Sequence, residues 1–479
     1  MLPGTAVERT VWSAVVALGI AVLMAALDMT IVVIALPAIG EEFGAPPDAA
    51  QWLILAYNLP LIALMLPAGR WLEPVNRRTA LVGAVSGFAI TSALAAAAPS
   101  FELLLAARAV QGVFGALLSV SVLPIAAAVV HPSQRGQAMG VIAMLGPLGS
   151  IAGPGLGGLL VAGPGWRWIF FVNVPICLLA IALARSSVPS RGALRGVTAD
   201  FVAETVTSGT AALSLVLALQ RAPLDGWGSP LVVVLLAVAL VAAATWTRLP
   251  NSRPAVGVLL RNAALSGQLL ILLVGATSMG AGYFLISFFL QGPLGMASSI
   301  AGAVLLVLPL SIGAAAQFGG RAADRFGVRL PGTIGAALIL AGGVLLLPLA
   351  TEWRNVDIAV RLAVIGMGSG LLVGPNQAAI MAAAPPALMG TVGGLSSLAR
   401  ALGFALGPAL ATTLWWHGQL TPEAMRPAFA LMAVLPAFLL AAVLITPTQT
   451  PPTVVAAPSL PVQAVAMSSA PSSRTGENP

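Results

Sequence analysis

One acidic residue, Asp28, lies inside an otherwise apolar stretch, in the string LDMTIVVIALPAI. No other ionisable group occurs between Val11 and Ile39, a segment long enough to cross a bilayer, which takes roughly 20 apolar residues. A carboxylate in such a segment costs about 2.5–3.5 kcal/mol on insertion scales, so it usually faces an aqueous path or a charged partner. Asp28 is therefore the first candidate for reversible protonation on an ion or substrate pathway.

The matching basic residue is Arg108, which lies in the fourth apolar stretch at a similar depth. A buried arginine requires an anion, and Asp28 is the only acid deep in an apolar stretch of the N-terminal half. The two residues form either a proton-responsive pair, with Arg108 and burial acting in opposite senses on the carboxyl group, or a permanent structural ion pair. Tyr57, Asn58 and Gln111 are candidate polar groups of the same cavity.

Other kinds of chemistry lack the residues they need. Cys177 is the single cysteine, and the two histidines, His131 and His417, are far apart, so the sequence predicts no disulfide and no metal site. Every residue of the Lys and Arg class is arginine, which excludes a Walker A phosphate loop. We therefore expect neither an enzyme nor a bound cofactor, and any uphill transport would have to use an ion gradient.

The composition is that of a membrane protein. Of the 479 residues, 58% are hydrophobic and only 8% are charged, whereas soluble domains carry roughly 25% charged residues. The net charge of +7 arises from arginines in short connections between apolar stretches, which points to membrane topology rather than to nucleic-acid binding. The expected partners are the lipid bilayer, protons and a small molecule.

Apolar stretches bounded by charges or by Gly and Pro predict fourteen transmembrane helices, in an all-α polytopic fold. The spans are about 11–38, 51–71, 78–98, 102–130, 136–162, 168–187, 199–219, 229–248, 267–290, 300–320, 330–350, 357–383, 390–415 and 424–446. A count of twelve would leave 199–248, two strongly apolar stretches, in a loop. The segment 447–479, rich in Pro, Ser, Ala and Val, is predicted to be a disordered cytoplasmic tail.

Arginines predict the orientation of these spans. With the N-terminus inside, thirteen arginines fall in inner connections: Arg70, Arg77, Arg78, Arg135, Arg185, Arg191, Arg195, Arg248, Arg253, Arg261, Arg321, Arg325 and Arg329. Five fall in outer connections: Arg167, Arg221, Arg354, Arg361 and Arg426. This positive-inside bias places both termini in the cytoplasm of a multi-pass protein of the inner or plasma membrane.

The two halves of the sequence repeat. GRWLEPVNRR from Gly69 matches GRAADRFGVR from Gly320 at an offset of 251, and Gly136 matches Gly390 at an offset of 254. Such a repeat indicates a duplicated bundle, the architecture of alternating-access transporters. The predicted domains are a six-helix bundle over 1–190, two extra helices with linkers over 191–262, and a second six-helix bundle over 263–446.

Five strings in order resemble the major facilitator superfamily and, within it, the fourteen-helix drug:proton antiporters. They are LDMTIVVIALP with QWLILAYNL, GRWLEPVNRR, ARAVQGVFGA, GSIAGPGLGGLL and WRWIFFVNVPI, and the resemblance covers about residues 11–446. The second string departs from the family pattern, since Glu73 replaces an aspartate and Asn76 a glycine. The C-terminal copy keeps both family residues.

The resemblance implies roles for three sets of residues. Asp28 and Arg108 would couple protons to transport. A gating surface that limits leak would be formed by Gly149, Gly153, Pro154, Gly157 and Gly158, although ordinary close packing of small residues explains the same pattern. A charge network that latches the cytoplasmic side in one state would be formed by Glu73, Arg77, Arg78, Asp324, Arg325 and Arg329, which could equally be simple topology signals.

Within the C-terminal spans, Asn376, Gln377 and Arg400 are further candidate cavity residues. The function that follows is proton-coupled export of amphiphilic drugs or antibiotics by alternating access, by a chain that acts as a monomer. One alternative is dedicated export of a single endogenous metabolite, as in self-resistance. Another is a membrane scaffold or sensor without flux.

Overall fold

The computed structural model describes residues 9–447 except 46–48, 50–51, 74, 191–197, 251, 297, 351 and 416–420. Fourteen helical segments of this part are long and apolar enough to cross a membrane, which confirms the predicted class and number of spans. Helices are expected because a bilayer offers no water to the backbone, so N–H and C=O groups must pair within each segment. The predicted disordered tail lies almost wholly outside the described residues.

The helices follow the chain in three groups. The first half contains α1 (Trp12–Phe43), α3 (Trp52–Trp71), α4 (Arg77–Ala96), α5 (Phe101–Val129), α6 (Arg135–Ala162), α7 (Trp168–Phe171) and α8 (Asn173–Ser187). The middle contains α9 (Ala199–Asp225), α10 (Pro230–Arg248) and the short α11 (Arg253–Arg261). The second half contains α12 (Ala263–Gln291), α13 (Ser298–Leu305), α14 (Val307–Phe326), α15 (Arg329–Leu346), α16 (Asn355–Ala383), α17 (Met389–Leu414), α18 (Pro422–Phe429) and α19 (Leu431–Ile445).

Two predicted spans are interrupted by proline, and three continue at least five residues past their predicted C-terminal ends. Pro175 and Pro309 have no N–H group, so the carbonyls of Phe171 and Leu305 lose their usual partners, and α7 and α13 end at these residues. Helices α1, α9 and α14 continue past the predicted ends at 38, 219 and 320, as far as Phe43, Asp225 and Phe326. Each stops at a glycine with positive φ, a backbone conformation that other residues rarely adopt.

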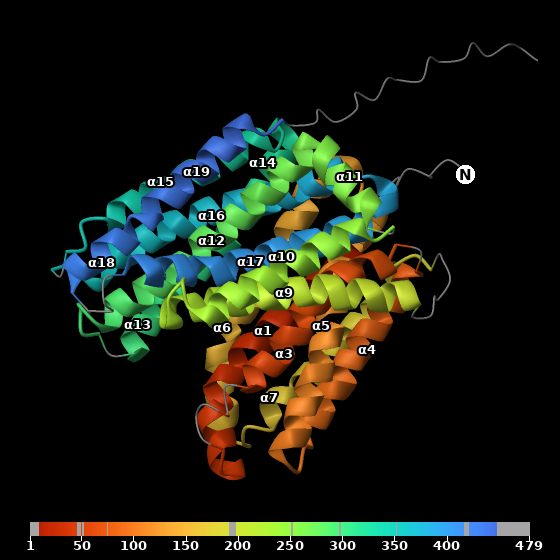
Figure 1. Ribbon diagram of the computed structural model, residues 1–479, viewed down its shortest axis with the longest axis horizontal. Coiled ribbons are helices and arrows are strands. Elements are labelled where there is room, and N and C mark those ends of the chain that lie inside the picture. Colours follow the sequence, from red (N-terminus) through yellow and green to blue (C-terminus); the bar gives the residue numbers. More distant parts are fainter. Residues whose placement is uncertain are drawn as a thin grey trace, which may run out of the picture.

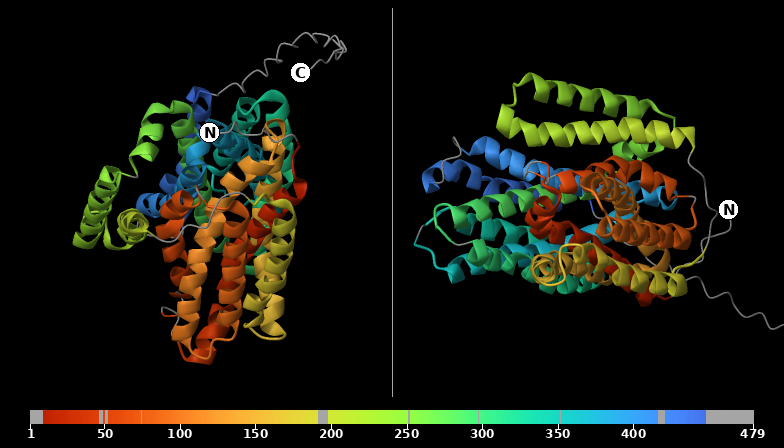
Figure 2. Two further views of the ribbon diagram at one scale, coloured as in Figure 1. Left: turned by 90° about the vertical axis from the view of Figure 1, so that its right-hand side faces the viewer. Right: turned by 90° about the horizontal axis from the view of Figure 1, so that it is seen from below.

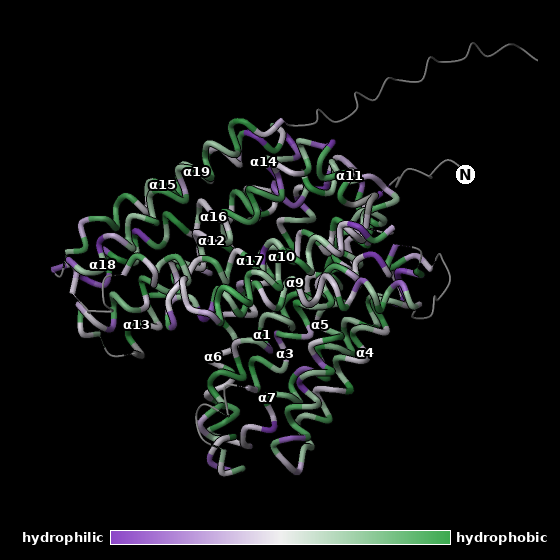
Figure 3. The backbone as a smooth tube through the Cα atoms, in the orientation of Figure 1, coloured by the Kyte–Doolittle hydropathy of each residue, from purple (hydrophilic) through white to green (hydrophobic). Residues whose placement is uncertain are grey.

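The two halves form separate helix bundles that meet at one end and diverge toward the other (Figure 1). Leu18 and Phe88 of the first bundle belong to an apolar cluster that continues into the second bundle at Leu265. A further apolar cluster of the second bundle contains Leu362 and Phe429. In lipid such cores are held by close van der Waals packing rather than by the hydrophobic effect. The hydropathy of the residues agrees with helices that cross a membrane, because apolar residues fill the helices and polar residues concentrate at their ends (Figure 3).

We call the end at which α1 begins and α19 ends the terminal end. The Val11 N–H donates to the Val129 carbonyl at 2.9 Å, which places the start of α1 beside the end of α5. In the second bundle, Asn262 Nδ2 donates to the Ala383 carbonyl at 2.9 Å, which ties the start of α12 to the end of α16. In both bundles the first span therefore begins beside the end of the fourth span.

The bundles touch at the terminal end through two pairs of glycines. A Cβ on Gly69 of α3 would overlap the Gly390 carbonyl of α17, and a Cβ on Gly136 of α6 would overlap the Gly320 carbonyl of α14. Gly320 is the repeat counterpart of Gly69, and Gly390 that of Gly136. The two crossings are therefore one contact made twice, as expected for a duplicated bundle that associates about a pseudo-twofold axis.

Helices α9 and α10 pack on each other and lie along one side of the two bundles (Figure 2). Near its start, α9 is joined to the first bundle by an ion pair between Arg70 Nη1 and Glu204 Oε1 at 2.6 Å. Just beyond its other end, Trp227 Nε1 donates to Thr413 Oγ1 of α17 at 2.8 Å. The pair is thus attached to the first bundle at the terminal end and to the second bundle at the opposite end.

Candidate functional site

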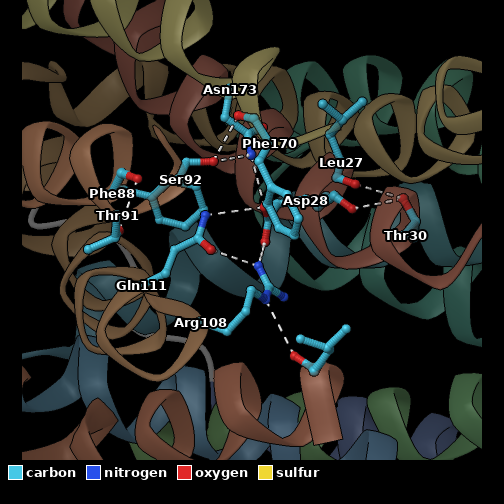
Figure 4. Close-up of polar contacts among 12 residues, drawn as sticks. Leu27, Asp28, Thr30, Phe88, Thr91, Ser92, Arg108, Gln111, Phe170 and Asn173 are labelled. Carbon is cyan, nitrogen blue, oxygen red and sulfur yellow. Dashed lines mark hydrogen bonds and ion pairs between the residues drawn. The ribbon is translucent and has the colours of Figure 1, made fainter. Parts of the chain in front are cut away.

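Asp28 lies in the middle of α1 and is fully buried, with 0% of its surface exposed. Its Oδ2 accepts from Arg108 Nη1 at 2.7 Å, and its Oδ1 accepts from Asn173 Nδ2 at 2.9 Å and from Gln111 Nε2 at 3.3 Å. Helices α1, α5 and α8 therefore meet at one carboxylate (Figure 4). The pairing of Asp28 with Arg108 that the sequence predicted is present, and Gln111 joins it.

Arg108 makes further contacts besides the ion pair. Its Nη1 donates to Gln111 Oε1 at 2.8 Å and its Nε to the Leu53 carbonyl at 3.3 Å. The guanidinium carbon lies 4.5 Å from the centre of the Tyr57 ring, so Tyr57 supports the cation through its π face. An ion pair with additional hydrogen bonds of this kind is the arrangement in which attraction can offset the loss of solvation.

Two members of the network, Asn173 and Ser92, were not identified from the sequence. Asn173 Nδ2 donates to Ser92 Oγ at 3.0 Å as well as to Asp28, and Ser92 Oγ donates to the Phe170 carbonyl at 2.9 Å. Asn173 stands in the string WRWIFFVNVPI, where it is the one amide in an apolar sequence. A single amide in an apolar sequence was the available signal for Asn173. Ser92 gives no such signal, because a serine hydroxyl in a transmembrane helix can bond to a backbone carbonyl of its own helix.

This arrangement suits a switch. With Asp28 ionised and Arg108 charged, the site is neutral overall and each carboxylate oxygen has a donor. A proton added to Asp28 would leave Arg108 without its counter-ion. The new O–H group would also face groups that are themselves hydrogen-bond donors. Because these groups are shielded from water, such a proton would leave buried polar groups without suitable partners, which is costly.

The glycines of α6 bring that helix close to α1 on either side of Asp28. A Cβ on Gly149 would overlap the Leu23 carbonyl, and one on Gly153 would overlap the Thr30 side chain. Gly157 contacts Ile31, whereas Gly158 has open space beside it. Of the predicted gating surface, Gly149, Gly153 and Gly157 thus form the contact with α1 and Gly158 does not, while the side chain of Pro154 lies outside the described residues.

The two acids of the predicted latch each bond to the first turn of a helix in the other bundle. Glu73 Oε1 accepts from the Thr391 N–H at 3.1 Å and from the Thr391 hydroxyl, at the start of α17. Asp324 accepts from the N–H groups of Gly136 and Gln137, both at 2.7 Å, at the start of α6. A carboxylate is favourable at a helix N-terminus, so these contacts hold the terminal ends of the bundles together.

Burial raises the pKa of Glu73 above its ordinary value of 4.5, although the two bonds from Thr391 act in the opposite direction.

The arginines predicted for the same latch form hydrogen bonds elsewhere. Arg78 Nε donates to the Val188 carbonyl at 2.6 Å and Arg329 Nη2 to the Leu444 carbonyl at 2.5 Å. Within the described residues, Arg77 and Arg325 have no ion pair with either acid. The latch is therefore made by helix N-termini rather than by arginine–carboxylate pairs.

The remaining predicted cavity residues do not join the Asp28 network. Asn58 is half-buried on α3, and Asn376 Nδ2 donates to Gln268 Oε1 at 2.7 Å, a contact between α16 and α12 inside the second bundle. Gln377 follows it and is largely buried. Arg400 is exposed on α17 and has no ion pair in the described part of the chain. No set of three or more His, Cys, Asp or Glu residues among the described residues could hold a metal ion.

Comparison with known proteins identifies the family. The model of the Major Facilitator Superfamily matches residues 18–408 and 269–472. The chain belongs to the major facilitator superfamily. It is 30% identical over 412 residues to the tetracenomycin C resistance and export protein of Streptomyces glaucescens, covering 85% of this chain and 76% of that protein. It is 32% identical over 418 residues to the puromycin resistance protein pur8 of Streptomyces alboniger, covering 85% and 82%.

A third superfamily relative is the multidrug efflux pump LfrA of Mycolicibacterium smegmatis, 31% identical over 411 residues, covering 84% of this chain and 81% of that protein. Among solved structures, the human organic anion transporter MFSD10 (TETRAN) superposes with a TM-score of 0.62 at 17% identity, covering 90% of this chain and all of that one. The structural likeness concerns the fold. Together these findings make the chain a multi-pass membrane transporter related to antibiotic and multidrug efflux proteins.

Proposed function

We propose that this superfamily member is a proton-coupled antiporter that exports amphiphilic small molecules across the cytoplasmic membrane. The observation that carries this proposal is the buried Asp28–Arg108 pair, because ionisable residues inside membrane spans are costly and commonly mark an ion or substrate pathway. The relatives that confer resistance to tetracenomycin C, puromycin and several drugs support export as the direction of transport.

The observed conformation corresponds to one state of an alternating-access cycle. The terminal ends of the bundles, which we assign to the cytoplasm, are held by Glu73 and Asp324, whereas the opposite ends diverge (Figure 1). We therefore assign this conformation to the outward-facing state. A proton that reaches Asp28 from outside would weaken its attraction to Arg108. The bundles would then rock about the glycine crossings, and the acids of the latch would leave their helix N-termini.

The cargo meets the protein in the inward-facing state. Binding of an amphiphile and release of the proton to the cytoplasm would restore the Asp28–Arg108 pair and return the bundles to the observed state. The chain is expected to work as a monomer, because the repeat places a complete pair of bundles within one polypeptide. In this cycle Asp28 alone carries the exchanged proton.

A flux experiment tests this proposal. Proteoliposomes with an imposed pH gradient should accumulate ethidium when they contain the intact chain, whereas Asp28→Asn, which keeps the shape but cannot release a proton, should show only background uptake. Glu204→Gln is the matched control, since Glu204 is the other buried acid in the described part of the chain, and this variant should keep proton-driven transport. Full pH-driven flux in Asp28→Asn would refute the assignment, and loss in Glu204→Gln alone would move the coupling role to Glu204.

A specific observation also favours the narrower alternative of a dedicated exporter, since two relatives are named for one antibiotic each. Resistance to a panel of unrelated antibiotics in a pump-deficient strain separates the two. Protection against several chemical classes supports a multidrug exporter, while protection against a single class supports the dedicated one. A scaffold or sensor would give no flux with any compound in the proteoliposome assay.

A further inference from the structure

Asn173 uses only one end of its amide. Its Nδ2 donates to both Asp28 and Ser92, while its Oδ1 is buried and has no hydrogen-bond partner. The whole residue is shielded, with 0% of its surface exposed. Buried polar atoms without partners are rare and generally have a reason, and here the free acceptor belongs to the same side chain that holds the carboxylate (Figure 4).

The second amide at the carboxylate has no such freedom. Gln111 Nε2 donates to Asp28, but its Oε1 already accepts from Arg108. If Gln111 exchanged its two ends, its NH₂ group would face the guanidinium, donor against donor. Asp28 Oδ2 is covered by Arg108, so an incoming proton is received at Oδ1, which faces both amides. Only Asn173 can then offer this O–H an acceptor.

We propose that Asn173 is the positioning residue that reads the protonation state of Asp28. When Oδ1 of the carboxylate takes up a proton, the Asn173 side chain turns about its Cβ–Cγ bond and exchanges its two ends. The formerly free Oδ1 of Asn173 accepts the new O–H, and Nδ2 leaves both Asp28 and Ser92. When the proton departs, the amide returns. No covalent bond changes, and one proton enters and leaves.

The exchange is transmitted to the junction of α7 and α8. Ser92 of α4 donates to the Phe170 carbonyl one residue before α7 ends, and Pro175 leaves the Phe171 carbonyl without its helical partner. The junction is therefore held from outside by Ser92, which itself is oriented by Asn173. Loss of the Asn173–Ser92 bond on protonation frees this junction to bend, and that movement accompanies the rocking of the bundles. The inference rests on the proton-coupling role of Asp28.

Few titratable side chains surround Asp28. Arg108 on α5, Tyr57 on α3 and Cys177 on α8 are the titratable side chains that face it. Helix α7 carries no titratable group, and the only one on α6 is Arg135 at the terminal end. Tyrosine and cysteine remain neutral at physiological pH and arginine remains charged, so the charge of the network changes through Asp28.

Infrared difference spectroscopy of the full-length protein in liposomes tests the exchange without any substrate. The C=O stretch of protonated Asp28 is assigned as the band that disappears in Asp28→Asn. In Asn173→Leu the band should remain but move to higher frequency, because the O–H has lost its acceptor. Thr91→Val is the matched control, since the Thr91 hydroxyl bonds only to the Gly87 and Phe88 carbonyls of its own helix, and it should leave the band in place.

Transmission is tested by the pH dependence of the distance between spin labels at the non-terminal ends of α7 and α18. The label distances give the ratio of molecules that are open to molecules that are closed at this end, and this ratio changes with pH. Asn173→Leu and Ser92→Ala should each reduce that pH-dependent change by about tenfold, the effect of one buried hydrogen bond. Ser92→Ala is the milder change and keeps the test available if Asn173→Leu fails to fold. An unshifted band together with a full pH response in these variants would overturn the proposal. Loss of the pH response in the wild type or its persistence in Asp28→Asn would instead refute the proton-coupling role itself.

Discussion

At the scale of single residues, the charges of the membrane interior are unevenly distributed. Asp28 is neutralised by Arg108, and Glu204 by Arg70. Arg400 remains without an ion pair in the described part of the chain. The interior therefore carries an excess of positive charge, and this excess bears on which cargo can be accommodated.

Arg400 lies on the face of α17 that contacts the first bundle. One turn earlier, Ser397 Oγ donates to the Ser119 carbonyl of α5 at 3.3 Å, and Gly393 packs against Val120. One turn later, Phe404 on the same side is 40% exposed. Arg400 thus borders the space between the bundles beyond their contact, beside an apolar ring.

We expect this arrangement to disfavour divalent cations relative to neutral, anionic and monovalent amphiphiles. A second positive charge about 10 Å from Arg400 would cost about 1–2 kcal/mol, or roughly tenfold in preference. Resistance of a pump-deficient strain to a monovalent lipophilic cation and its divalent relative measures the effect. Arg400→Gln should narrow the difference. Stronger protection by the wild type against the divalent compound would contradict the expectation.

Glu73 gives the latch a pH dependence. Its pKa is raised by burial against α17, so Glu73 is protonated more easily where the latch is closed than where it is open. Protonation of Glu73 therefore stabilises the closed latch. This stabilisation is complete below the ordinary pKa of 4.5 and is lost as the pH rises through the raised pKa of the closed state. Spin labels on the terminal ends of α3 and α17 should show more closed molecules at acidic pH. Glu73→Gln should remove that dependence, and an unchanged pH profile in this variant would assign it to another group.

At the scale of elements, glycines of α6 determine how closely α6 approaches α1 near Asp28. Gly149 and Gly153 let the backbone of α6 lie against Leu23 and Thr30, within two turns of Asp28. In lipid, small residues at such crossings provide the packing that holds helices together. A side chain added at the crossing would separate the two helices and displace the carboxylate from its donors.

Gly149→Ala should lower the stability of the protein by about 1–3 kcal/mol, the usual cost of overpacking, and should reduce proton-driven flux in the ethidium assay. Gly158→Ala is the matched control on the same helix, because open space lies beside Gly158, and it should behave as the wild type. Thermal unfolding in detergent measures the first effect. Equal stability of the two variants would show that α6 can move away from α1 without cost.

At the scale of the whole molecule, the helix ends of both bundles and of the α9–α10 pair fall into two sets, one at the terminal end and one at the opposite end. All the contacts that define the terminal end involve helix ends that the arginine distribution assigns to the cytoplasm. Residues Arg221 and Asp225 lie at the other end, near the Trp227 contact with α17. The orientation can be checked directly with reporters.

Reporters fused after Arg195 and after Arg261 should both report the cytoplasm, and one fused after Asp225 should report the exterior, because thirteen arginines against five favour this orientation. Alkaline phosphatase and green fluorescent protein fusions at the same positions serve as mutual controls, since each is active on one side only. A cytoplasmic signal at Asp225 would remove the α9–α10 pair from the membrane and reduce the count to twelve spans.

The sequence by itself determined the class, the number of spans, the repeat and the pairing of Asp28 with Arg108, because a bilayer imposes long apolar stretches and makes each ionisable residue within them conspicuous. Only the tertiary structure decided that Asn173 and Ser92 complete the network, that Glu73 and Asp324 bond to helix N-termini, and that α9 bridges the bundles. These contacts join residues about 80 to 320 positions apart, or use backbone N–H groups. Long-range contacts and contacts to backbone N–H groups leave no periodic or compositional pattern in the sequence. An amide, a serine or the start of a helix has the same sequence whether or not a partner lies beside it in the fold.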